Sequence, residues 1–134
     1  MAMGAKALTF TVPAENESVS LSRSQVAQWM AGRLKSCADA LLVLTELLTN
    51  AIEHGTAGCA VEVRVRCRAV GVEVRVNNEG GGVPLPQPEV AADEHGRGLM
   101  LVAGLSSQWS YLQRSTGPNR SITSAWAVVP YEPS

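Results

Sequence analysis

The 134-residue sequence contains few cysteines, and they do not form a metal-binding pattern. The sequence has an odd number of cysteines, Cys37, Cys59 and Cys67, and their spacing matches neither a CxxC motif nor a zinc site. The N-terminus also lacks the basic patch and apolar segment that secretory signals carry. These absences favour a protein of the reducing cytoplasm that folds without disulfide bonds or a structural metal.

The sequence also lacks an excess of either charge and a long apolar run. Lys and Arg number 11 against 12 for Asp and Glu, so no overall field draws the molecule onto nucleic acid or an anionic membrane. The longest strongly apolar run, residues 38–48, is interrupted by polar residues and is shorter than the ~20 residues of a membrane span. We therefore expect neither nucleic acid nor a membrane as a direct partner.

The length predicts a single domain over residues 1–134, with no linker and no internal repeat. Residues 7–12 alternate weakly between polar and apolar types and predict a strand, followed by a polar loop over 13–20. Ser22 with Gln25 resembles a capping box, which predicts a first helix over about 23–35.

A second helix and a hairpin have the clearest periodicity. Apolar residues recur at helical spacing from Leu41 to Ile52, and Gly55 is a plausible end for this helix. Residues 61–67 and 70–76 then alternate with period two, which predicts two antiparallel strands that each have one wet face.

The rest of the chain predicts a long loop, a short helix and two strands, over residues 80–95, 98–105, 108–114 and 122–129. The element order predicts an α/β fold, a two-layer sandwich in which helices cover one face of a mostly antiparallel, mixed sheet.

Three groups of polar or glycine residues are candidates for a functional site. Glu46, Asn50 and Glu53 with His54 share one stripe of the second helix, where they could ligate a hard cation or form a solvated helix edge. Asn77 to Gly82 could approach a ligand closely or form an ordinary flexible turn. Gly96-Arg97-Gly98-Leu99 precedes an apolar helix, whose free N–H groups suit a phosphate.

In this fixed order the three groups resemble the motifs of the GHKL ATPases, the superfamily of histidine kinases, DNA gyrase and heat-shock chaperones. Residues 46–55, ELLTNAIEHG, resemble the N box, residues 76–80, VNNEG, the first glycine box, and residues 95–102, HGRGLMLV, the second. Residues 123–126, TSAW, resemble the last strand of the family. The resemblance implies the ATP-binding fold of that superfamily, the Bergerat fold.

Carried over to this sequence, the resemblance implies ATP and Mg²⁺ as cofactors. Asn50 would ligate the magnesium, Glu46 would be the catalytic base, and Asn78 would face the adenine amino group. Further contacts to the nucleotide would come from Gly80 and Gly82 at the adenine pocket and from Gly96, Arg97, Gly98, Leu99 and Ser124 at the phosphates. Residues 83–95 would form a lid.

The sequence departs from the family pattern at Asn78, where an Asp is usual. An amide oxygen can still accept the adenine hydrogen bond, but without charge assistance, a loss on the order of 1 kcal/mol or five- to tenfold in affinity. The amide NH2 also needs an acceptor, because burying it unpaired adds a further cost.

Within the superfamily the sequence resembles the stand-alone anti-sigma-factor serine/threonine kinases most. That resemblance implies a sigma factor and an anti-anti-sigma protein as partners. Two alternatives stay open: a partner-docking module with weak or no ATP binding, and the detached ATP domain of a sensor kinase. The resemblance also implies a homodimer as one arrangement, in which Val26, Trp29 and Met30 could form an interface instead of core.

Other singled-out residues have simpler interpretations. His54 and His95 suit polar loop or helix-end positions, Arg97 suits either a phosphate contact or a solvated loop, and Arg64, Arg66 and Arg68 suit the wet face of a strand. The tryptophans at 29, 109 and 126 each fall in an apolar periodic segment and predict core positions.

Overall fold

The computed structural model describes residues 2–3, 7–31, 38–55, 58–79, 94–118 and 120–131. In chain order its elements are β1 (Ala2–Met3), β2 (Ala7–Pro13), α1 (Glu17–Ala31), α2 (Ala38–His54), β3 (Ala60–Arg68), β4 (Gly71–Glu79), α3 (Glu94–Leu105), β5 (Gln108–Gly117) and β6 (Arg120–Val129). No helix in these ranges is both long and apolar enough to span a membrane.

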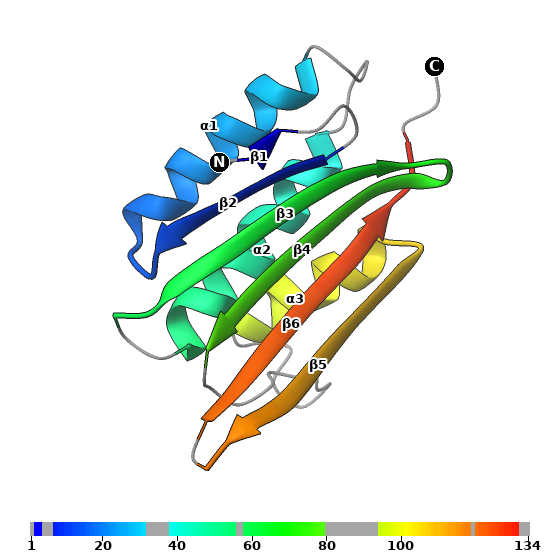
Figure 1. Ribbon diagram of the computed structural model, residues 1–134. Coiled ribbons are helices and arrows are strands. Elements are labelled where there is room, and N and C mark those ends of the chain that lie inside the picture. Colours follow the sequence, from blue (N-terminus) through cyan, green and yellow to red (C-terminus); the bar gives the residue numbers. More distant parts are fainter. Residues whose placement is uncertain are drawn as a thin grey trace.

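The strands form one six-stranded sheet in the order β1-β2-β3-β4-β6-β5. The three helices lie on one face of the sheet, which we call the inner face, and no helix among the described elements covers the outer face (Figure 1). The predicted α/β two-layer sandwich is confirmed. The described pairings are all antiparallel, so the parallel component of the expected mixed sheet is absent from this part of the chain.

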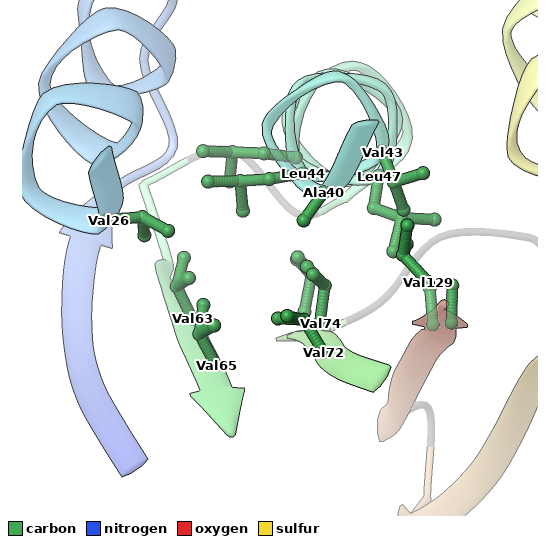
Figure 2. Close-up of a cluster of buried hydrophobic side chains, with 14 of the residues drawn as sticks. Val26, Ala40, Val43, Leu44, Leu47, Val63, Val65, Val72, Val74 and Val129 are labelled. Atoms are coloured by element: carbon green, nitrogen blue, oxygen red, sulfur yellow. The ribbon is translucent and has the colours of Figure 1, made fainter. Parts of the chain in front are cut away.

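The core forms where α2 packs on the inner face of the sheet. Leu44 and Leu47 of α2 lie against Val63 of β3 and Val74 of β4, and all four side chains are buried (Figure 2). Each buried aliphatic side chain of this size stabilises the fold by about 1.5–3 kcal/mol relative to full exposure. This contact fixes the rotation of α2, and therefore also where its polar residues point.

The first helix begins earlier than the capping pattern predicted. It starts at Glu17, directly after Asn16, a residue type that helices favour as their N-cap. Ser22 lies inside the helix and is buried, so the Ser22–Gln25 pattern was not a helix start. Small polar residues on the buried side of α1 hid the apolar periodicity of its first turns.

The third helix also begins earlier than expected, at Glu94 rather than Gly98. Residues 95–98, predicted as loop or helix entrance, therefore belong to its first turns. Of the predicted lid over residues 83–95, only the last two residues fall within the described ranges.

The core of the single chain includes Val26, Trp29 and Met30, which are all buried. Of the two positions left open for them, core or dimer interface, they therefore occupy the core. Trp109 packs against the edge of the core. Trp126 was predicted as core but lies on the outer face, where the guanidinium carbon of Arg75 is 6.0 Å from the centre of its ring. Trp126 alternates with Ala125 and Ala127, and these small residues occupy the inner face instead.

Candidate functional site

Two asparagines from different elements meet at the C-terminal end of α2. Asn50 is 4% exposed and Asn78 of β4 is 8% exposed, and both line one small cavity on the inner face. They are 28 residues apart in sequence, and the packing of α2 on β4 brings them together. Buried amides require hydrogen-bond partners, so their local contacts show which of their atoms remain available.

Both amides direct their NH2 groups toward the protein. Nδ2 of Asn50 donates to the hydroxyl oxygen of Tyr111 at 3.4 Å, and Nδ2 of Asn78 donates to the backbone carbonyl of Glu79 at 3.4 Å. The two amide oxygens accept no hydrogen bond from the described residues. Each side chain therefore presents an acceptor oxygen at a buried position. The acceptor that the NH2 of Asn78 needs is the Glu79 carbonyl.

Tyr111 of β5 was not singled out from the sequence, and it connects Asn50 with Glu46. Burial raises the pKa of Tyr111 to about 12; the hydrogen bond from Asn50 opposes this shift, and the negative charge of Glu46 adds to it. Glu46 lies one helical turn before Asn50 and does not line the cavity itself. Glu46 and Asn50 lie on one stripe of α2, as expected. Tyr111 of the sheet adds a third polar group, which accepts a hydrogen bond from Asn50 and is influenced by the charge of Glu46.

The cavity between α2 and the sheet is small and mostly apolar. Its walls are Leu47, Asn50, Ala51 and His54 from α2, and Asn78, Tyr111, Thr123 and Ala125 from β4, β5 and β6. Its volume of about 10 Å³ corresponds to about one water molecule. His54, for which a helix-end position was the simpler interpretation, closes one side of it.

Gly55 allows the end of α2 to approach Asn78 closely. A Cβ atom at Gly55 would lie 2.5 Å from the carbonyl oxygen of Ala51 and 2.8 Å from Nδ2 of Asn78. Both separations are shorter than a real Cβ contact allows. Only glycine therefore fits here while α2 and the Asn78 side chain keep their positions.

The hydroxyl predicted to assist at the phosphates lies on the other face of the sheet. Ser124 pairs with Asn77 in the β4–β6 ladder, and its hydroxyl donates to Oδ1 of Asn77 on the outer face. Thr123 pairs with Asn78 instead, is 4% exposed and lines the cavity. Successive side chains of a strand point to opposite faces, so only one of these two hydroxyls can face the helices, and it is Thr123.

The remaining predicted site residues come from the two glycine boxes. Gly80 and Gly82 lie outside the described residues. Gly96, Arg97 and Gly98 belong to the first turns of α3, which packs against α2. Leu99 is buried in α3 and does not line the cavity between Asn50 and Asn78.

Cys59, to which no chemistry was assigned, donates a hydrogen bond from Sγ to a carboxylate oxygen of Glu79 at 3.1 Å. This bond is the main cause that raises the pKa of the Cys59 thiol. A raised pKa favours the thiol over the reactive thiolate, so this environment does not activate the residue.

Comparison with known proteins identifies the family. The sequence pattern of the histidine kinase-like ATPase domain matches residues 12–124. The chain belongs to this family. The match spans the residues that resemble the N box and the two glycine boxes, and it includes every residue that lines the cavity except Ala125.

Other comparisons add little to the family match. A search of curated proteins finds no match. Among solved structures, the fold is similar to that of the histidine kinase AdeS of Acinetobacter baumannii, with a TM-score of 0.44 and 15% identity, over 95% of this chain and 69% of that one.

The residues of the cavity suit the ligands that ATPase domains of this family take. The amide oxygens of two buried residues, Asn50 and Asn78, accept no hydrogen bond from the described residues, and Glu46 lies one helical turn before Asn50 on α2. Carboxylate and amide oxygens are the ligands that Mg²⁺ prefers, and an amide oxygen can accept a hydrogen bond from an amino group of a base.

We predict that Gly55→Ala destabilises the protein by about 1–3 kcal/mol, because the added Cβ meets backbone and must displace either α2 or Asn78. Urea unfolding measures the change. Gly104→Ala in α3 is the matched control, since a Cβ there meets nothing within 4 Å, and it should be neutral or stabilising by up to about 1 kcal/mol. Equal stabilities for the two variants would contradict the close approach at Gly55.

The raised pKa of Tyr111 predicts a loss of stability at alkaline pH. An ordinary tyrosine with a pKa near 10.0 ionises in the unfolded chain before Tyr111 does in the folded protein, so the free energy of unfolding falls between about pH 10 and about pH 12. Tyr111→Phe should show a shallower fall over this range in urea unfolding. Parallel curves for the two proteins would show that Tyr111 is not held neutral by the fold.

Proposed function

We propose that this chain is an ATP-binding regulatory protein that uses the end of α2 facing β4 as its nucleotide site. The observation that supports this most directly is the pair of amide oxygens on two buried residues, Asn50 and Asn78, that accept no hydrogen bond from the described residues. An amide oxygen can ligate a hard cation or accept a hydrogen bond from an amino group.

Under this proposal each residue has a distinct role. Oδ1 of Asn50 ligates Mg²⁺, and Tyr111 holds the amide so that its oxygen, not its NH2, is presented. Oδ1 of Asn78 accepts a hydrogen bond from the adenine amino group. The first turns of α3 supply backbone N–H groups for the phosphates, with Thr123 taking the place expected of Ser124 on the inner face.

We further propose that the bound nucleotide serves a protein serine/threonine kinase that acts as an anti-sigma factor. ATP supplies the phosphoryl group when bound, and the Glu46 carboxylate accepts the proton of the attacking serine or threonine hydroxyl. The partners are a sigma factor and an anti-anti-sigma protein, which place the protein in the cytoplasm. The sequence of the N-box motif, ELLTNAIEHG, and the presence of both Glu46 and Asn50 support the kinase proposal.

A second candidate is a docking module with weak or no ATP binding. Two observations favour it. Asn78 stands where the family usually has Asp, and the cavity that the described residues enclose has room for about one water molecule. In that case the polar residues at the end of α2 would be retained for structure, and regulation would depend on partner binding alone.

Calorimetric titration with ATP and Mg²⁺ tests the nucleotide site. We expect one-site binding that Asn50→Ala removes, and that Asn78→Asp strengthens about five- to tenfold by restoring charge assistance. Asn77→Asp is the matched control, because its side chain lies on the outer face, and it should leave affinity unchanged. No binding at millimolar ATP by the parent or by Asn78→Asp would leave the docking module as the function.

Phosphoryl transfer tests the kinase version. The protein is incubated with candidate antagonist proteins and ATP labelled in its γ-phosphate, beside Glu46→Gln. Acid-stable label on a serine or threonine that Glu46→Gln reduces by about 10²-fold or more would support the proposal. Acid-labile label would indicate transfer to histidine, as for an ATP domain of a sensor kinase. ATP binding without transfer to any candidate would contradict the kinase version.

A further inference from the structure

The outer face of the sheet gathers most of the arginines of a nearly neutral chain. Six of them project from it: Arg64, Arg66, Arg68, Arg75, Arg114 and Arg120. Among the described residues, three acidic side chains share this face, namely Glu62, Glu73 and Glu79. The described part of the face therefore carries an excess of three positive charges, which the overall charge of −1 does not reveal. No described helix covers this face (Figure 1).

The three described acidic side chains of the outer face each accept a contact from a neighbour, Glu62 from Nδ2 of Asn77 at 2.8 Å. Glu73 is 5% exposed and is contacted by Arg66 at 3.2 Å, Arg68 at 3.3 Å and Arg75 at 3.9 Å. Glu79 is contacted by Arg120 at 3.3 Å. These ion pairs hold one side of the face in a fixed arrangement.

Arg64 and Arg114 differ from the other four arginines. Both are exposed, and neither makes an ion pair with a described residue. Together with Arg75 they line an open groove of about 400 Å³ across the sheet, with Asn77, Ser124 and Thr11 among the polar groups at its base. Glu62 and Glu79 also line the groove, so its three arginines exceed its carboxylates by one.

Apolar groups lie beside this charge. Leu112 is 60% exposed and pairs with Ser124 at the groove, and Ile122 lines the groove itself. Trp126 lies half-buried next to Arg75. Protein–protein interfaces are enriched in arginine and tryptophan and depleted in lysine. Residues of these two enriched types often contribute most of the binding energy.

We propose that this groove, together with Leu112 and Trp126, is a docking site for an acidic segment of a partner protein. Carboxylates of the segment pair with Arg64 and Arg114, and apolar residues between them cover Leu112 and Ile122. Glu62 and Glu79, which line the groove, would repel the continuous phosphates of nucleic acid and favour a partner whose charges are spaced. The site is on the opposite face from Asn50, so it does not rest on the proposed nucleotide function.

Fluorescence anisotropy with two labelled peptides of equal charge tests the proposal, without nucleotide. One alternates glutamate with leucine and the other alternates glutamate with serine. We expect the leucine peptide to bind more tightly, and to lose about fivefold or more in affinity for each of Arg64→Glu and Arg114→Glu. Arg23→Glu, an exposed charge on α1, is the control and should bind as the parent does. Binding should weaken as salt rises.

Chemical-shift mapping on the parent protein locates the site without any variant. Perturbations at Arg64, Ser124 and Arg114 are expected, whereas perturbations confined to α1 or to the Asn50 cavity would overturn the proposal.

In the peptide-binding experiment, equal affinity for the two peptides would also overturn the proposal. The same holds if the Arg64→Glu and Arg114→Glu variants bind as the parent does while keeping its thermal unfolding midpoint. Tighter binding of a single-stranded oligonucleotide would reassign the face to nucleic acid, and self-association lost in Arg64→Glu would reassign it to a second copy of the chain.

Discussion

The packing of α2 on the inner face of the sheet is the contact on which the rest of the structure depends. Its leucines fill the space above β3 and β4, so the helix cannot rotate without exposing them. This fixed rotation carries Asn50 to the one point where β4 presents a polar side chain inward. The chemistry at the end of α2 is therefore set by apolar contacts within the two turns before Asn50, and Gly55 allows the final approach to Asn78.

The sheet divides the molecule into two surfaces with different chemistry. On the inner face, two buried asparagines and a phenol line a small cavity. On the outer face, three arginines and two glutamates line an open groove. Neighbouring residues of one strand serve both, since Asn78 and Thr123 face inward where Asn77 and Ser124 face outward. A partner on the outer groove and a ligand at the cavity would therefore contact the same two strands without competing for space.

Sequence patterns predicted those parts of the fold that local periodicity determines. The second helix and the hairpin were correct because apolar residues recur in them at helical spacing and at period two over many residues. The start of α1 was wrong because Ser18 and Ser22 are polar yet buried. Ser124 was placed at the phosphates by the family resemblance, and Trp126 was predicted as core because β6 has apolar residues on both faces, so its alternation does not show which side packs on the helices.

The sequence by itself determined the family, the two-layer fold and the position of Glu46 one helical turn before Asn50, because each of these depends on residues close together in the chain. Tertiary structure decided that Tyr111 holds the Asn50 amide, that Thr123 and not Ser124 faces the cavity, and that six arginines form one basic face. The bond between Asn50 and Tyr111 joins residues 61 positions apart, and strand register sets which residues of β4, β5 and β6 share a face. Overall composition averages over such neighbours, so the net charge gave no sign of the basic groove, although the alternation of β3 placed Arg64, Arg66 and Arg68 on one strand face.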